Sequence, residues 1–101
     1  MAKVVPFPSQ PTAEQLVERI QAALAESAIE FDHPHVQKRL AQRGLQMRHV
    51  LECLRSGEVI DGPKMDKYSD RRIKLRRYVA GRKVQVVVAV KLRRVVVTTV
   101  I

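Results

Sequence analysis

The stretch His33–Glu58, HPHVQKRLAQRGLQMRHVLECLRSGE, predicts two short helices separated by one glycine. Pro34 suits a first helical turn, where its missing N–H would have no partner in any case, and Asp32 or His33 can cap the helix. Gly44 supplies the left-handed position at which helices commonly end. The rest of the chain is therefore expected to fold around this pair of helices.

The second helix of the pair has one regular apolar stripe. Its members follow the spacing i, i+3, i+4 and i+7, and they are Met47, Val50, Leu51 and Leu54. Such a stripe predicts a helix that packs on a flat apolar surface. His49 is expected to point away from the stripe, and Cys53 to be a packing residue rather than a nucleophile. Gly57 is expected to end this helix in the way that Gly44 ends the first.

From Arg71 to Ile101 the apolar pattern changes to a period of two, which predicts three antiparallel strands at about 72–80, 82–91 and 94–101. Ala80 and Gly81 supply the first turn between them. The middle strand is apolar on both faces and carries four valines on one of them, so it is expected at the centre of the sheet. Those valines are Val84, Val86, Val88 and Val90.

The remaining segments complete a single α+β domain over residues 12–101. A capping box of Thr12 and Gln15 begins an N-terminal helix that is expected to run to about Ser27. Short strands are predicted at 28–32, at the sheet edge, and at 58–61, where Gly62-Pro63 would stop the strand; 64–70 reads as a loop. The fold is thus a helix followed by β-α-α-β-β-β, with a mainly antiparallel sheet and the helices on one face. Residues 1–11, with three prolines, are expected to form a flexible tail.

Charge is distributed unevenly along the chain. The net charge is +9, and the sequence pI is about 10.5. Residues 1–32 contain two basic and five acidic side chains, whereas residues 33–101 contain 17 basic and five acidic ones. Residues 71–101 contain ten basic side chains and no acidic one. A polyanion such as nucleic acid is therefore the expected partner of this part of the chain.

Several other classes of protein are disfavoured by the composition. One cysteine permits no internal disulfide, and no apolar run is long enough to cross a membrane, so a cytoplasmic protein without a membrane partner is expected. His33 and His35 lack a well-spaced third ligand, which argues against a metal site. No glycine-rich phosphate loop, Ser-His-Asp set or Cys-His pair is visible, and no cofactor is expected.

Two groups of residues are candidates for function. On the first helix of the pair, a basic and titratable face contains His35, Lys38, Arg39 and Gln42, with Arg43 close to the helix end. On the strand at 72–80, alternation places one set of side chains on the face opposite Ile73 and Leu75. That set is Arg72, Lys74, Arg76 and Tyr78.

The string HVQKRLAQRGL, with the later LRSGEVI and the terminal VVVAV and RVVVTTVI, resembles a family of small bacterial domains of unknown function. Its pattern runs H-x-x-x-R-[ML]-x-x-R-G-[IL], then a helix, then G-x-[VI], then a β-meander with a late threonine. The resemblance covers about residues 31–101. The resemblance implies a fold similar to that of RelE-like and barnase-like metal-independent ribonucleases associated with toxin–antitoxin loci. Carried over by position, the motif residues are His35, Arg39, Arg43, Gly44, Gly57 and Thr99. The chain departs from the pattern at three positions: Val36, where alanine is usual, the additional His33, and Phe31, which lies one place further from the histidine than expected.

On this resemblance, the expected function is a toxin-like endoribonuclease that acts on free or ribosome-bound RNA and is neutralised by an acidic antitoxin. Cleavage without metal needs a base, an acid and cations around the phosphate, and these roles are assigned to His35, Arg39, Arg76 and Tyr78. Lys38, Arg43, Arg72 and Lys74 are assigned to nucleic-acid binding. Tyr68 can stack on a base or be a loop tyrosine without a specific role. The alternative is a non-catalytic module that binds nucleic acid or the ribosome through the same cations.

Structural roles remain open for the same residues. His35 can be a helix cap, and Arg39 can be tied to an acidic neighbour such as Asp32. The cations of the strand at 72–80 can keep a sheet surface soluble and protect an edge from pairing with another chain. The glutamates of the N-terminal helix are either solvated or a cover for the basic surface.

Overall fold

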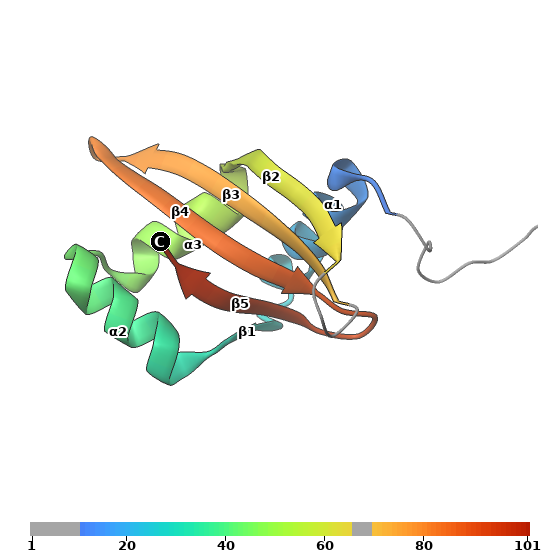
Figure 1. The fold of residues 1–101 in the computed structure, drawn as a ribbon, viewed down its shortest axis with the longest axis horizontal. Coiled ribbons are helices and arrows are strands. Elements are labelled where there is room, and N and C mark those ends of the chain that lie inside the picture. The colour runs from blue at the N-terminus through green and yellow to red at the C-terminus, as the bar shows by residue number, and fades with distance from the viewer. Residues whose placement is uncertain (1–10, 66–69) are drawn as a thin grey trace, which may run out of the picture.

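The chain forms three helices and one five-stranded sheet in a computed structural model that describes residues 11–65 and 70–101 (Figure 1). The helices are α1 (Ala13–Ala25), α2 (His33–Arg43) and α3 (Met47–Ser56), and the strands are β1 (Ile29–Phe31), β2 (Glu58–Met65), β3 (Arg71–Val79), β4 (Arg82–Val90) and β5 (Val95–Val100). The strand order is β1-β5-β4-β3-β2. β4 is thus the central strand, as its apolar faces predict.

The sheet is mixed, because β1 pairs with β5 in parallel while the other pairings are antiparallel. β3 and β4 are joined by a two-residue turn in which Ala80 and Gly81 both have positive φ, 52° and 78°. This geometry follows the right-handed twist of a hairpin. The predicted α+β fold, with a mainly antiparallel sheet and helices on one face, is confirmed.

The helices cover one face of the sheet and bury its core. Val50 and Leu54 of α3 are buried, and Met47 and Leu51 pack against the same cluster, so the predicted stripe faces the sheet. α1 adds Leu16 and Ile20 to this core. The sheet contributes Ile73, Leu75, Val84, Val86, Val88, Val90, Val95, Val97 and Val100. Because α1 lies on this side, its glutamates do not cover the opposite face of the sheet.

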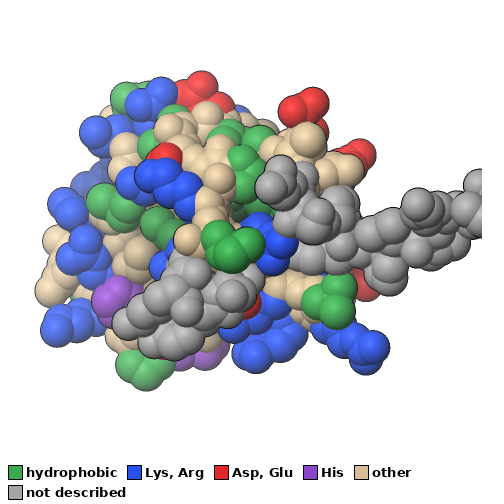
Figure 2. All heavy atoms as spheres, turned by 45° about the vertical axis from the view of Figure 1, so that its right-hand side comes forward, with side chains coloured by type: hydrophobic (Ala, Val, Ile, Leu, Met, Phe, Trp, Pro, Cys, Tyr) green, Lys and Arg blue, Asp and Glu red, His purple; other side chains and the backbone are tan. Residues whose placement is uncertain are grey.

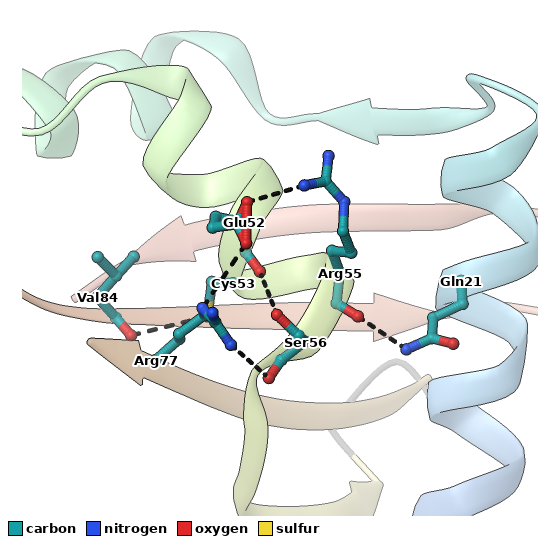
Figure 3. Close-up of polar contacts among 7 residues, drawn as sticks. All are labelled: Gln21, Glu52, Cys53, Arg55, Ser56, Arg77 and Val84. Carbon is teal, nitrogen blue, oxygen red and sulfur yellow. Dashed lines mark hydrogen bonds and ion pairs between the residues drawn. The ribbon is translucent and has the colours of Figure 1, made fainter. Parts of the chain in front are cut away.

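The C-terminal half of α3 is tied to its neighbours by polar contacts (Figure 3). Arg77, on the helix-covered face of β3, donates from Nη1 to the carbonyl of Ser56 at 3.3 Å, and its Nε lies 3.8 Å from Glu52 Oε2. Gln21 of α1 donates to the carbonyl of Arg55 at 2.9 Å. Arg77 therefore has a structural role, which separates it from the cations on the other face of β3.

α2 lies beside β5, where β1 has ended (Figure 1). β1 pairs with Val95 to Val97 of β5, and the Asp32 N–H then donates to the Val97 carbonyl at 3.0 Å. Val36 and Leu40 are the buried residues of α2. Gly44 ends the helix with φ 63°, in the left-handed region, as predicted.

Two local predictions are wrong. β2 does not stop at Gly62-Pro63 but continues to Met65 through irregular pairing with β3. Gly57 has an extended conformation, φ −71° and ψ 155°, so it is not a left-handed helix end. A Cβ at Gly57 would lie 2.4 Å from the Cys53 carbonyl oxygen, which shows that the glycine is needed for space.

His49, which was expected to point away from the stripe, is buried all the same, with 7% of its surface exposed. Its Nδ1 accepts a hydrogen bond from the Gln46 N–H at 2.8 Å, and it thereby caps the start of α3. Helical periodicity did not indicate this because a first-turn side chain can fold back onto the cap.

The other local predictions have mixed outcomes. α1 ends at Ala25, two residues before the expected end, and its capping box of Thr12 and Gln15 is confirmed. The expected tail, apart from its last residue, and the stacking role of Tyr68 lie outside the described residues. In the described part of the chain, no helix is long and apolar enough to cross a membrane.

Candidate nucleic-acid interface

The face of the sheet turned away from the helices, here called the open face, carries the predicted set of β3 side chains. Alternation places the buried Ile73 and Leu75 of β3 toward the helices, and the even-numbered side chains of the strand therefore face the other way. Arg72, Lys74 and Arg76, here called the β3 row, are all partly exposed. Their cross-strand neighbours on β4 are Ala89, Val87 and Gln85, respectively. The row thus runs beside a strip of β4 that changes from apolar to polar.

Tyr78 continues the β3 row toward the turn and is 61% exposed. It lies opposite Lys83 of β4, and the Arg76 guanidinium carbon is 6.0 Å from its ring centroid. An exposed aromatic ring between two cations is a surface on which a nucleic-acid base can stack.

Carboxylates of β2 flank the β3 row on one side. Glu58 accepts from Arg76 at 2.5 Å and 3.1 Å, and this charged hydrogen bond raises the pKa of the Arg76 guanidinium. Asp61 pairs across the strands with Lys74 and forms an ion pair of 3.2 Å with Lys64. The β2 side of the open face therefore carries charges of both signs. On the β4 side, the cross-strand neighbours of the row include no carboxylate.

A basic pocket adjoins the open face at its β3–β4 turn end. It has a volume of about 380 Å³ and is lined by Arg43, Leu45, Arg82, Lys83, Gln85 and Ile101. Its charged lining residues are all cations. Arg82 Nη1 also contacts the carbonyl oxygens of Arg43 and Gly44 at the end of α2. This contact fixes one wall of the pocket to α2.

The pocket and the β3 row form one surface. Gln85 lines the pocket and is the cross-strand neighbour of Arg76, while Lys83 lines it and is opposite Tyr78. Sequence analysis did not single out Arg82, Lys83 or Gln85. The sequence was sufficient to indicate Lys83, because a two-residue turn at Ala80-Gly81 pairs Lys83 with Tyr78.

The α2 candidates separate into different places. His35 and Lys38 are exposed. Arg39 donates from Nε to the Val100 carbonyl at 2.9 Å, and from Nη1 to Gln42 at 3.3 Å. Arg43 lies in the basic pocket. Asp32, which precedes α2, makes no side-chain capping bond.

Arg76 and Tyr78 are together, but His35 is not with them. His35 lies on α2 beside β5, and both β5 and β4 intervene before β3, a lateral separation of roughly 10 Å from strand spacing alone. Thr99, carried over from the family pattern, is the cross-strand neighbour of Val87.

Cys53 is fully buried, and burial raises the pKa of its thiol to about 12. A protonated, enclosed thiol is a packing group, as expected. Among the described residues, no group of three or more His, Cys, Asp or Glu side chains is arranged to hold a metal ion.

Lys and Arg side chains are spread widely over the face of the molecule seen in Figure 2. Figure 2 shows Lys and Arg over its left and lower parts, with Asp and Glu mostly toward the upper right.

The family described as a domain of unknown function, DUF4258, matches residues 33–101. The chain belongs to this family. The match begins at the first residue of α2 and includes the β3 row and the basic pocket, and it leaves α1 and β1 outside. No curated protein and no solved structure matches the chain.

Proposed function

We propose that the open face binds single-stranded RNA, with the β3 row and the basic pocket as one continuous cationic surface. The observation that carries the proposal is the pairing of Arg76 with Gln85 and of Tyr78 with Lys83, which joins the two. Phosphates would lie along the cations, because these supply most of the affinity for a polyanion. The exposed ring of Tyr78 would stack on a base, which requires unpaired bases.

Protection of a sheet edge does not account for the β3 row. Edge strands commonly carry charges that discourage pairing with another chain. β3, however, lies between β4 and β2, and both of its edges are hydrogen-bonded. Its cations therefore have no edge to protect. Solubility does not require ten basic and no acidic side chains in residues 71–101, so binding is the better explanation for the row.

The test compares two triple variants that remove the same charge. The first replaces the β3 row: Arg72→Gln, Lys74→Gln and Arg76→Gln. The matched control replaces exposed cations of α3 and of the β4–β5 turn: Arg48→Gln, Arg55→Gln and Arg93→Gln. Affinity for labelled single-stranded RNA is measured at several salt concentrations.

The slope of log affinity against log salt should become shallower by about two in the row variant, at about 0.7 per lost phosphate contact. The control should retain the wild-type slope. Equal slopes in the two variants, or no binding by the wild type at low salt, would show that the open face is not the binding surface.

An acidic antitoxin-like protein would meet the same surface, since charge complementarity favours the same cations. The expectation is competition: an acidic partner that binds this chain should displace RNA. The row variant should lose both ligands together.

Cleavage of the bound RNA, as by a toxin-like metal-independent endoribonuclease, is the second candidate function. The observation that favours it is the Arg76–Tyr78 pair, which places a guanidinium beside an exposed phenol on the proposed RNA surface. A phenol can transfer a proton, and a guanidinium can stabilise the charge that develops on phosphate. A toxin-like ribonuclease is also what the sequence resemblance over residues 31–101 implies.

A further inference from the structure

A second pocket opens on the open face at the other end of the β3 row, between β2 and β3. Its volume is about 290 Å³. It is lined by Asp61, Gly62, Lys64, Met65, Arg72, Ile73, Lys74 and Val87. The pocket is near the lower limit of size for ligand sites, which suits a group no larger than one nucleobase.

Irregular pairing of β2 creates this pocket. The register slips between Val59 and Asp61 and again between Asp61 and Lys64, so β2 bends while β3 runs regularly. Gly62 has φ 91°, and a Cβ there would lie 2.5 Å from the Arg72 carbonyl oxygen. Only glycine permits this approach of β2 to β3. Bulges that re-aim side chains in this way are frequent beside functional sites.

The lining combines three kinds of group. Met65 is 59% exposed, and with Val87 it supplies apolar surface for the faces of a flat ring. Lys64, Arg72 and Lys74 supply positive charge at the rim. Among the described residues of the lining, Asp61 is the carboxylate, and its side chain is 42% exposed. Apolar walls, cations and one hydrogen-bond acceptor match a nucleotide, whose base is flat and whose phosphate is anionic.

We propose that this pocket takes one base of the RNA strand and that Asp61 selects a base with an exocyclic amino group, so that cytosine is preferred to uracil. The inference deepens the RNA binding proposed above and rests on it. A carboxylate accepts hydrogen bonds and cannot donate them. At the same ring position cytosine presents an amino donor, whereas uracil presents a carbonyl oxygen that the carboxylate would repel.

The carboxylate is held in the form that this selection needs. A hydrogen bond from Lys64 keeps the pKa of Asp61 below its ordinary value. One carboxylate has about four acceptor positions, so the ion pair with Lys64 leaves others for a base. Lys64 thus keeps Asp61 ionised and in place without occupying it fully.

The experiment measures binding of oligocytidine and oligouridine of equal length, both with 2′-O-methyl groups so that neither can be cleaved through its 2′-hydroxyl. The variants are Asp61→Asn and the matched control Glu58→Gln. Both remove one negative charge from β2, but Glu58 contacts Arg76 outside this pocket. Each variant removes one negative charge and releases one cation, Arg76 or Lys64, so the ratio of the two affinities is compared rather than either affinity alone.

The wild type should bind oligocytidine roughly tenfold more tightly than oligouridine, within the range for one good base contact. Glu58→Gln should keep this ratio, and Asp61→Asn should abolish it, because an amide can also donate to the uracil oxygen. Methyl resonances of Met65 and Val87 should shift on addition of oligocytidine. Equal wild-type affinities, or a ratio that survives in Asp61→Asn, would overturn the base selection while leaving RNA binding intact. Binding of neither oligonucleotide at low salt would instead overturn the proposed function.

Discussion

Arg39 Nε donates a hydrogen bond of 2.9 Å to the backbone carbonyl of Val100. β1 pairs with β5 only as far as Val97, so the outer edge of β5 beyond that point has no strand partner. The Arg39 guanidinium supplies a donor there in place of a strand. A residue that sequence analysis assigned to phosphate binding therefore closes the sheet edge against α2.

Replacing Arg39 is expected to affect stability more than RNA binding. Arg39→Ala should lower the free energy of unfolding by about 1–2 kcal/mol, the scale for a lost hydrogen bond from a charged group. Lys38→Ala, one residue earlier and exposed, should lower it by no more than about 0.5 kcal/mol. Urea unfolding and RNA affinity are measured for both variants. Unchanged stability with weakened RNA binding in Arg39→Ala would return the residue to the binding surface.

Gly57 and Gly81 are expected to respond to substitution for different reasons. Gly57→Ala should destabilise the fold by about 1–3 kcal/mol, because its Cβ would press on the Cys53 carbonyl. Gly81 has φ 78° with nothing within 4 Å of an added Cβ, so Gly81→Asn should be tolerated. Thermal unfolding of the two variants tests this, and a smaller loss in Gly57→Ala than in Gly81→Asn would contradict it.

Periodicity was sufficient to predict most of the fold. Local sequence patterns predicted three features that the structure has: the buried valines of β4, the α3 stripe and the turn at Ala80-Gly81. The course of β2 through Gly62 depends on close contact with the Arg72 backbone, and that contact is not encoded in the local pattern. Gly57 follows the last residue of α3 as predicted, but its environment requires space for the backbone rather than a left-handed φ.

The candidate site was predicted only where it lies on one element. Alternation alone places Arg72, Lys74, Arg76 and Tyr78 on one face. Both pockets join residues that are distant in the sequence, such as Arg43 with Lys83, and so depend on strand order and register. The grouping of His35 with Tyr78 required α2 to lie beside β3, whereas α2 lies beside β5.

Cys53 should make the free energy of unfolding depend on pH in the alkaline range. Its pKa is raised to about 12 in the folded protein, against about 8.5 in an unfolded chain. Above about pH 8.5 the unfolded state loses the thiol proton first, so the contribution is present below that pH and is lost as pH rises toward 12. Wild-type stability should fall more steeply there than that of Cys53→Ala, by up to about 1.4 kcal/mol per pH unit. Parallel urea-unfolding curves over this range would show that the thiol ionises when folded.

RNA cleavage, the second candidate function, is expected to persist in chelator and to leave 2′,3′-cyclic phosphate ends, because the proposed groups are side chains and the nucleophile is the 2′-hydroxyl. Tyr78→Phe keeps the aromatic ring but removes its hydroxyl group. This variant should slow cleavage at least about a hundredfold, the scale for one acid–base group. His35→Ala should slow it less, since β4 and β5 separate α2 from the Arg76–Tyr78 pair. A hundredfold loss in His35→Ala with normal cleavage by Tyr78→Phe would instead locate the reacting phosphate at α2. RNA that is bound but not cleaved by the wild type would exclude the ribonuclease and leave a binding module.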